Sequence, residues 1–298
     1  MKIGIIANIN KESVLEVVSS FINKLKENDI DYLLTNSLKE QNGKIIKAIE
    51  ENLLIDDNNL FQESDLIISL GGDGTMLTTA FNAHKFDKPV LGINLGKLGF
   101  LVEANVSHLD LVLESIKNQK YSIEERMIIE GECLNNNSDK MIAINDIVID
   151  KGAYPKMIEL TVWVDDEYVT TFTADGLIVA TPTGSTGYSI SVGGPIVNPQ
   201  ADVISLSPIS PHSLTIRPIV LPSKSLIVIK ADSLYKDLKV NCDGQRSYSF
   251  SPPIELKISK SQRALKLVHT SITTYFDTLR KKLLWGIDTR YSNKGDRK

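Results

Sequence analysis

The sequence predicts two domains of different class. We expect an α/β domain with a parallel sheet over residues 1–122 and an all-β, sandwich-like domain over residues 123–270, so that the chain is α+β overall. In the first third, apolar runs of strand length alternate with segments of helical spacing; beyond Tyr121 that spacing fades and short runs rich in β-branched residues take over. A length of 298 residues suits two domains. Helical or irregular spacing returns within residues 271–298, and we expect this tail to pack back on the first domain.

The first domain alternates strands with helices, which is typical of a parallel sheet covered by helices. Strands are expected over Lys2–Ala7, Asp31–Leu34, Asp65–Leu70 and Pro89–Asn94. Helices are expected over Ser13–Glu27, Ile45–Leu54, Thr75–Phe81 and Ser107–Lys117. Ser107 is the expected N-cap of the last helix, because its hydroxyl can accept a hydrogen bond from a free backbone N–H.

The second domain is expected to consist of short antiparallel strands. They are predicted at Ile142–Ile149, Ile158–Val164, Tyr168–Thr173, Leu177–Thr181, Leu226–Lys230, Leu238–Asn241, Ile254–Ile258 and Leu265–His269. The polar segment Val164–Tyr168 between two of them is typical of a hairpin turn.

Composition excludes several classes of function. The net charge of −4 gives no general basic field to attract nucleic acid. No stretch approaches the roughly 18 apolar residues of a membrane span, so no membrane partner is expected. Neither of the two cysteines lies in a CxxC pair, and no histidines stand at metal-ligand spacing, so we expect no protein-built metal site and a cytoplasmic protein.

A glycine-rich turn, Gly71-Gly72-Asp73-Gly74-Thr75, directly follows one predicted strand and precedes a helix. The N–H groups of such a turn and of a helix N-terminus form a cradle for anions. The motif is neither GxGxxG nor a Walker A loop, and for a lone Gly-Asp-Gly a tight turn with Asp73 as a capping residue is the more common interpretation. A carboxylate beside bound phosphate is unfavourable unless it accepts a proton or holds a cation.

Two polar segments in the second domain are candidates for ligand contacts. In Asn145-Asp146, an amide can pair with the edge of adenine and a carboxylate can accept bonds from ribose hydroxyls. The segment Thr183–Ser191 is dense in small hydroxyl residues and glycine, which suits a loop folded around a ligand. The alternatives are a turn before the strand that follows Asp146 and an ordinary surface loop.

Taken together, these segments resemble the NAD kinase family. The resemblance is carried by GGDGT at 71–75, NDIVI at 145–149, the run from Asp175 to Pro199, the run from Pro208 to Pro222 and CDGQ at 242–245. GGDGT also resembles the diacylglycerol-type lipid kinases and the phosphofructokinases, whereas TPTGSTGYS with the upstream Asn-Asp pair is specific to NAD kinases. The resemblance implies transfer of the terminal phosphoryl group of ATP, or of polyphosphate, to the adenosine ribose 2′-hydroxyl of NAD. It also implies a divalent cation, Mg²⁺, bound with ATP, and a homo-oligomer, most simply a tetramer.

The resemblance also implies residue roles. Asp73 corresponds to the general base, Gly74 lies against the dinucleotide, and Asn145 and Asp146 bind the adenosine moiety. The dinucleotide-contacting loop corresponds to Thr183, Thr186, Gly187, Tyr188, Ser189, Ile190 and Ser191. Asp175 matches a residue on the nicotinamide side, and Lys156, Ser210 and Gln245 match positions that line the site.

The chain departs from the family's pattern at a few places. Thr173 stands where relatives often carry Arg, Asp146 where many carry Glu, and Asn8–Lys11 where Asn-Pro is common. The basic residues from Arg280 to Lys282 are expected to be solvated.

Two alternatives to an NAD kinase remain. A lipid kinase of the diacylglycerol kinase type shares GGDGT, and it needs an exposed apolar entry surface that no segment of this sequence supplies. A catalytically silent NAD-sensing module is the non-enzyme alternative, and an intact GGDGT that keeps Asp73 argues against it.

Overall fold

The structure, a computed structural model, describes residues 1–298 except 12–13, 40–52, 97–98, 103, 136–139 and 287–298. The chain divides into two compact units. Unit 1 comprises Met1–Glu124 and Lys266–Lys298, and unit 2 comprises Glu125–Leu265.

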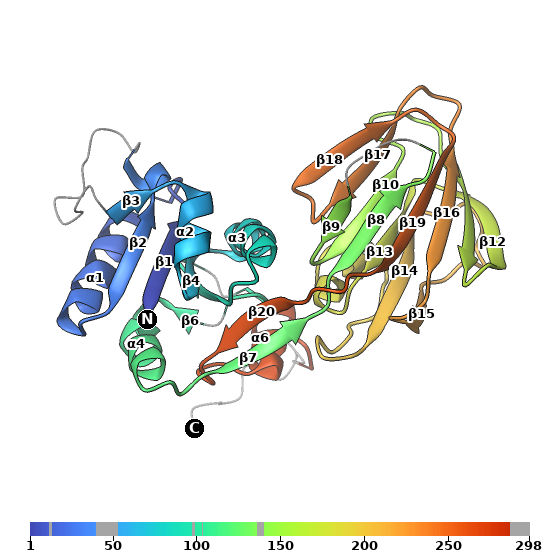
Figure 1. The fold of residues 1–298 in the computed structure, drawn as a ribbon. Helices are drawn as coiled ribbons and strands as arrows, with labels where there is room; N and C mark the ends of the chain where they lie inside the picture. Colours follow the sequence, from blue (N-terminus) through green and yellow to red (C-terminus); the bar gives the residue numbers. More distant parts are fainter. Residues whose placement is uncertain (12–13, 40–52, 97–98, 103, 136–139, 287–298) are drawn as a thin grey trace. The chain divides into compact units, whose positions relative to one another are not determined.

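A largely parallel sheet forms the centre of unit 1 (Figure 1). Its strands are β1 (Lys2–Ala7), β2 (Asp31–Thr35), β3 (Leu54–Ile55), β4 (Leu66–Gly71), β5 (Val90–Asn94), β6 (Ala104–Asn105), β7 (Ser122–Arg126) and β20 (Leu265–His269). They run in the order β3-β2-β1-β4-β5-β20-β7, with β6 paired to β5. Strand β1 pairs in parallel with β2 and β4, and β5 pairs in parallel with β4, β6 and β20.

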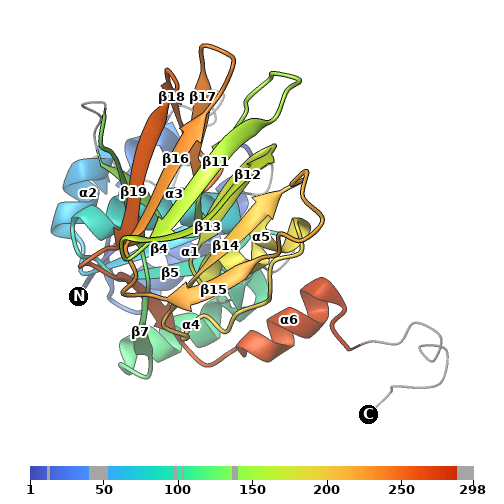
Figure 2. The ribbon, with the colours of Figure 1, turned by 90° about the vertical axis from the view of Figure 1, so that its right-hand side faces the viewer.

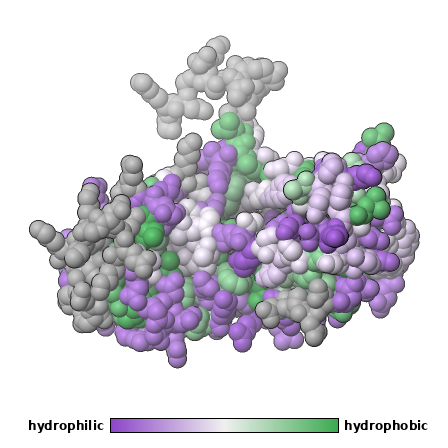
Figure 3. Space-filling view, turned by 90° about the horizontal axis from the view of Figure 1, so that it is seen from above, coloured by the Kyte–Doolittle hydropathy of each residue, from purple (hydrophilic) through white to green (hydrophobic). Residues whose placement is uncertain are grey.

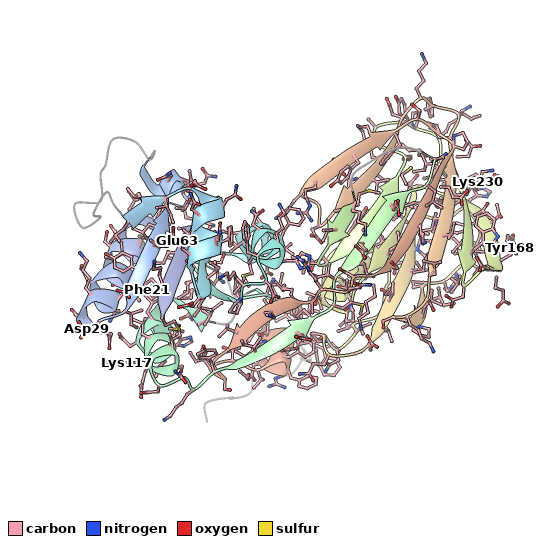
Figure 4. The ribbon with its side chains drawn as sticks, in the orientation of Figure 1. Phe21, Asp29, Glu63, Lys117, Tyr168 and Lys230 are labelled. Carbon is pink, nitrogen blue, oxygen red and sulfur yellow. The ribbon has the colours of Figure 1, made fainter. Side chains whose placement is uncertain are left out.

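Helices cover both faces of this sheet. They are α1 (Val14–Glu27), α2 (Asp57–Glu63), α3 (Asp73–Lys85) and α4 (Leu109–Lys117). A further helix of unit 1, α6 (Tyr275–Leu283), follows β20 in the chain. Ile3 and Ile5 share one core with Phe21, which points from α1 toward the sheet (Figure 4). Successive residues of a strand point to opposite faces, and a Cβ added at Gly4 would lie 2.6 Å from Leu60 of α2. Glycine at this position therefore lets α2 approach the opposite face.

Unit 2 is a sandwich of two antiparallel sheets. One has the order β15-β14-β13-β10-β17-β18 and the other β12-β11-β16-β19-β8-β9 (Figures 1 and 2). The first sheet contains β10 (Asp146–Asp150), β13 (Gly176–Ala180), β14 (Val203–Ile209), β15 (Ile219–Pro222), β17 (Leu238–Cys242) and β18 (Arg246–Phe250). The second contains β8 (Ile129–Cys133), β9 (Met141–Ala143), β11 (Ile158–Val164), β12 (Glu167–Ala174), β16 (Ile227–Asp232) and β19 (Ile254–Lys260).

One apolar core joins the two sheets of unit 2. Ile147 and Ile149 of β10 lie in the same cluster as Leu160 of β11 and Ile229 of β16. A smaller cluster, which includes Val148, lies on the opposite face of β10. Because both faces of β10 are covered, its three central residues, Ile147–Ile149, are all apolar rather than alternating with polar ones. Side chains on the outer faces of the sandwich are exposed to solvent, as Tyr168 of β12 and Lys230 of β16 are (Figure 4).

The structure confirms the expected fold class, an α/β unit with parallel strands and an antiparallel β unit. The hairpin turn expected within Val164–Tyr168 is also confirmed, since Val164 pairs with Glu167. Asp165 and Asp166 between them have φ of 51° and 66°. Positive φ at both central residues is the signature of a type I′ turn, whose twist matches that of the flanking strands.

Three expected elements differ in the structure. The strand predicted over Ile142–Ile149 is two strands, β9 and β10, which belong to different sheets. The strand Leu265–His269 was placed in the second domain, but it pairs with β5 in the sheet of unit 1. Ser107 is not an N-cap: the side chain of Asn105 accepts from the Ser107 N–H and caps the 3-10 turn η3 (Val106–His108) before α4.

One predicted helix cannot be compared with the structure, and several observed elements had no counterpart in the prediction. The helix expected over Ile45–Leu54 lies mostly outside the described residues, and Leu54 itself begins β3. Helix α2 and strands β8, β14, β15 and β18 were not predicted. In the described part of the chain, no helix has the length and apolar character needed to cross a membrane.

Candidate active site

The glycine turn of unit 1 joins β4 to α3. Gly71 ends the strand, α3 begins at Asp73, and Gly72 between them is the N-cap residue, without a side-chain cap bond. The alternative that the Asp73 side chain caps the helix is therefore wrong. A Cβ at Gly71 would lie 2.4 Å from the Thr75 side chain, so only glycine fits there. The first N–H groups of a helix lack partners within it, so the turn can receive an anion.

The carboxylate of Asp73 is held by a separate loop and by the C-terminal helix. The Phe100 N–H donates to Oδ2 at 3.0 Å and the Leu101 N–H donates to Oδ1 at 3.1 Å. Lys282 Nζ, from α6, donates to Oδ2 at 2.8 Å. A Cβ at Gly99 would lie 1.8 Å from Asp73 Oδ1, so this glycine leaves the space that the carboxylate occupies.

Asn8 lies beside the same turn. Its backbone N–H donates to the Leu70 carbonyl at 2.9 Å, and its Nδ2 donates to Thr75 Oγ1 at 3.2 Å. The segment Asn8–Lys11, where the sequence departs from the family's pattern, thus begins with a residue that supports the glycine turn.

Unit 2 contains a pocket of about 330 Å³ at the point where the chain passes from β9 in one sheet to β10 in the other. Its lining residues are Asn145, Asp146, Val148, Asp150, Tyr188, Asn241, Asp243 and Gly244. Tyr188 is 47 % exposed, and its ring can offer an aromatic face to a ligand. Three of the predicted site residues, Asn145, Asp146 and Tyr188, are therefore brought together.

The Asp243 carboxylate fixes the backbone at this crossing. It accepts N–H groups from Ile144 at 2.9 Å, Asn145 at 2.7 Å and Asp146 at 3.3 Å. The Arg246 guanidinium bonds to its other oxygen at 2.6 Å. Asp243 has a φ of 55° in the turn between β17 and β18. This turn conformation places the buried Asp243 carboxylate within hydrogen-bond distance of the N–H groups of residues 144–146, about a hundred positions earlier in the chain.

Two polar groups in the pocket suit a ligand. Asn145 Oδ1 is buried and has no hydrogen-bond partner among the described residues, so it is ready to accept an N–H group. Burial raises the pKa of Asp146 to about 7, with a further contribution from the negative charge of Asp243 and an opposing one from the Tyr188 N–H. Near neutral pH this carboxyl group can therefore either donate or accept a hydrogen bond.

The loop from Thr183 to Ser191 packs directly against Asn145-Asp146. It forms the 3-10 turn η4 (Thr183–Thr186) and the short helix α5 (Tyr188–Ser191). A Cβ at Gly184 would lie 2.0 Å from the Asn145 carbonyl, and one at Gly187 would lie 3.6 Å from Asn145 Nδ2. Glycine is therefore required at 184, and the interpretation of this segment as an ordinary surface loop does not hold.

The side chains of this loop divide into buried and accessible ones. Thr183 and Ser189 are buried, and Ser189 Oγ is 3.0 Å from Ser207 Oγ. Thr186, Gly187 and Ile190 are half-buried, and Ser191 is exposed. The buried hydroxyls support the loop, and the accessible groups are the ones that a ligand can reach.

The other predicted site residues do not line this pocket. Lys156, Ser210 and Gln245 are exposed, and the Asp175 carboxylate forms an ion pair with Lys151 at 2.6 Å. Gly74 is exposed in the glycine turn of unit 1. Thr173 is exposed on β12.

Several residues of these two sites were not predicted. They are Gly99, Phe100, Leu101 and Lys282 around Asp73, and Val148, Asp150, Asn241, Asp243 and Gly244 in the pocket. Asp243 stands in CDGQ, a segment that carried the family resemblance without a role for each residue. Lys282 was expected to be solvated; it is exposed, and its ammonium group also pairs with Asp73, a contact that was not predicted. No local pattern indicates these contacts.

Each of the two units matches a domain of one known family. Residues 3–121 match the ATP-NAD kinase N-terminal domain, and residues 144–270 match the ATP-NAD kinase C-terminal domain.

Similar proteins match over nearly the full chain. An NAD kinase of Prosthecochloris aestuarii is 39 % identical over 287 residues, covering 96 % of this chain and 98 % of that protein. An NAD kinase of Caldanaerobacter subterraneus subsp. tengcongensis is 40 % identical over 289 residues, with 95 % and 98 % covered.

Solved structures have the same fold. The crystal structure of yeast NADH kinase complexed with NADH gives a TM-score of 0.87 at 27 % identity, covering 98 % of this chain and 90 % of that one. An NAD kinase from Archaeoglobus fulgidus in complex with ATP gives a TM-score of 0.74 at 26 % identity, covering 95 % and 99 %.

Proposed function

Because the chain belongs to the NAD kinase family, we propose that it transfers the terminal phosphoryl group of ATP to the adenosine ribose 2′-hydroxyl of NAD, giving NADP and ADP. The observation that carries this proposal is the placement of Asp73. Its carboxylate lies at the phosphate-binding turn, is fixed by two backbone N–H groups and keeps room for a further hydrogen bond.

Asp73 acts as the general base. Phosphoryl transfer between oxygen atoms needs little covalent chemistry from the protein, and catalysis is mainly positioning and charge stabilisation. The terminal phosphate binds at the N–H groups between Gly71 and Thr75, and Asp73 orients the 2′-hydroxyl and accepts its proton as the oxygen attacks. A Mg²⁺ ion bound to the ATP phosphates would neutralise part of their negative charge.

Residues of unit 2 bind the dinucleotide. The unsatisfied oxygen of Asn145 suits the exocyclic amino group of adenine, and the Asp146 carboxyl suits ribose hydroxyls. The ring of Tyr188 stacks against the ligand, and the accessible part of the loop from Thr183 to Ser191 supplies further contacts. On the family resemblance, Gly74, Lys156, Asp175, Ser210 and Gln245 remain proposed contacts.

The two alternative functions are less well supported. A lipid kinase needs a broad apolar surface for its substrate, whereas the face in Figure 3 is mostly hydrophilic, with hydrophobic residues scattered over it. A silent sensing module has no use for a carboxylate held at a phosphate-binding turn. The relatives of 39–40 % identity are NAD kinases, and the Archaeoglobus relative is described with ATP, so we take ATP rather than polyphosphate as the donor.

We also propose a homo-oligomer, most simply a tetramer, in the cytoplasm. Exposed apolar side chains gather before and on β15, the edge strand of its sheet; they are Leu214, Ile219 and Val220. A second copy of the chain that covers them would remove apolar surface from water, and closed symmetric assemblies are the common outcome. Cys133 and Cys242 are buried and form no disulfide in the part of the chain that the structure describes, which suits a reducing compartment.

A coupled assay tests the proposed activity. Purified protein is incubated with Mg-ATP and NAD, and NADP is followed with a dehydrogenase specific for it. We expect NADP to form with NAD, and we expect nicotinamide mononucleotide, which lacks the adenosine half, to fail as an acceptor. Absence of NADP, or comparable phosphorylation of the mononucleotide, would refute the proposal; parallel reactions with NADH and with diacylglycerol would then identify the acceptor.

A further inference from the structure

Helix α6 (red, Figure 2) brings a lysine to the carboxylate of the proposed base. Lys282 Nζ lies 2.8 Å from Asp73 Oδ2 and 4.9 Å from the centroid of the Phe100 ring. The two paired residues are 209 positions apart in the sequence. We propose that Lys282 is a positioning residue for phosphoryl transfer: it neutralises Asp73 beside the phosphate-binding turn and occupies Oδ2, which leaves Oδ1 to take the proton.

Hydrogen-bond geometry distinguishes the two carboxylate oxygens. Each oxygen of an ionised carboxylate accepts about two hydrogen bonds. Oδ2 already receives the Phe100 N–H and the Lys282 ammonium group. Among the described residues, Oδ1 receives the Leu101 N–H, and it keeps one lone pair for a hydroxyl group. Without Lys282 each oxygen would accept one backbone N–H and keep one free lone pair. The acceptor hydroxyl could then bond to either oxygen, and its position would be less well defined.

Charge gives Lys282 a second effect. The glycine turn from Gly71 to Thr75 contains no cation, and Asp73 puts a negative charge where the ATP phosphates must bind. Like charges repel most strongly where water is partly excluded. An ammonium group on the same carboxylate cancels most of this repulsion, so Lys282 favours binding of the phosphate donor.

Among the three consecutive basic residues of α6, Lys282 is the one that contacts Asp73. Thr274 caps the helix by accepting the Asp277 N–H at 3.2 Å, and Leu279 is buried. Arg280 pairs with Asp277 on its own helix. Lys281 is exposed, and it therefore serves as a matched control.

Steady-state kinetics give the first test, which rests on the proposed kinase activity. Lys282→Met should lower kcat by roughly 10- to 100-fold, the effect of losing one hydrogen bond to a charged group. The KM for ATP should rise while the KM for NAD changes little. Lys282→Arg keeps the charge and the donors and should recover most of the loss, and Lys281→Met should match the wild type. Equal kinetics for Lys282→Met and Lys281→Met, or no recovery with Arg, would overturn the inference.

Calorimetric binding of Mg-ATP gives a second test that needs no turnover. Lys282→Met should weaken ATP binding in the otherwise unchanged protein but not in an Asp73→Asn background, where there is no charge to neutralise. An equal loss in both backgrounds would mean that Lys282 acts on ATP itself, and the positioning role would be rejected. A wild-type protein that forms no NADP would instead refute the proposed function, and the binding cycle would still report on the Asp73–Lys282 pair.

Discussion

At the scale of single residues, Asp73 combines a chemical role with a structural one. Its carboxylate is the proposed base, and it also accepts the N–H groups of Phe100 and Leu101. Asp146 is a second carboxyl group with a special environment, since burial and the charge of Asp243 raise its pKa to about 7. The environment of each carboxyl group, rather than its residue type, decides what it does.

The substitution Asp73→Asn should separate these two roles. Asn cannot accept the proton, so kcat should fall by roughly 10²–10⁴-fold, the usual contribution of general-base catalysis. The KM for NAD should change far less, the pattern of an interaction made in the transition state. Asn retains one acceptor oxygen for two N–H donors, so the free energy of unfolding should fall by about 1–3 kcal/mol. Near-normal turnover of the folded variant would mean that Asp73 has only a structural role.

Asp146→Asn should change how stability depends on pH. The pKa of Asp146 is raised from 3.8 to about 7 in the folded state, so between these values the folded protein holds a proton that the unfolded chain has lost. Stability therefore falls as pH rises through this window, by up to about 1.4 kcal/mol per pH unit. Asn does not titrate, so the variant should gain stability relative to the wild type from pH 4 to 7, with a plateau above. Urea unfolding at several pH values measures this difference, and a constant difference would contradict the assignment.

At the scale of elements, loops and turns place the functional groups. The loop of Gly99–Leu101 receives the Asp73 carboxylate, and the turn between β17 and β18 holds the crossing from β9 to β10. In both cases a carboxylate accepts hydrogen bonds from backbone N–H groups. Such hydrogen bonds are charge-assisted, and they are stronger than those between neutral groups.

Gly99→Ala should displace the Asp73 carboxylate without removing it. The added Cβ would lie 1.8 Å from Oδ1, so either the loop or the carboxylate must move. A misplacement of about 1 Å can cost roughly 10²-fold in rate. Gly96→Ala is the matched control, because a Cβ there meets no atom of the described residues within 4 Å. If the two variants have the same kcat, the position of the carboxylate does not limit the reaction.

Asp243→Asn should destabilise unit 2 and weaken dinucleotide binding. The carboxylate is buried and accepts hydrogen bonds from three backbone N–H groups and from Arg246. Asn has one acceptor oxygen and no charge, so these donors lose acceptors and the Arg246 guanidinium loses its counter-charge. Breaking a buried charge pair costs about 3–5 kcal/mol. Denaturant unfolding measures this, and the KM for NAD should rise because Asn145 and Asp146 lose their support.

A matched control for Asp243 is Asp165→Asn. Asp165 is also a turn residue with positive φ, but it is exposed and accepts the Leu226 N–H at 2.8 Å. This variant should lose no more than about 1 kcal/mol. Comparable losses for the two variants would show that the Asp243 contacts add nothing beyond turn formation.

At the scale of the whole molecule, the oligomeric state can be measured directly. Light scattering at micromolar concentration should give about four times the mass of one chain, as expected for a symmetric assembly. Val220→Lys, which places a charge on the exposed edge strand β15, should reduce that mass. A monomer mass for the wild type would reject the proposed tetramer, and an unchanged mass for Val220→Lys would exclude β15 from the interface.

Much of the fold follows from local patterns in the sequence. Strand Lys2–Ala7 and helix Val14–Glu27 match their predictions closely, because burial of one face imposes a periodicity that the residues themselves display. The glycine turn is equally visible, since tight backbone turns between a strand and a helix require specific residue types. The strand predicted over Ile142–Ile149 is wrong because the apolar residues on both sides were taken as one run, whereas the polar pair Asn145-Asp146 inside it marks the change of sheet.

By itself the sequence determined the class of each unit, many of its helices and strands, the family, and the candidate residues Asp73, Asn145 and Asp146, because these depend on composition, spacing and motif. Only the tertiary structure decided which groups surround them. Asp243 meets Asn145 across 98 positions of sequence, and Lys282 meets Asp73 across 209. The physical reason is that a hydrogen bond or an ion pair depends on distance in space, and folding alone brings such distant positions within 3 Å of each other.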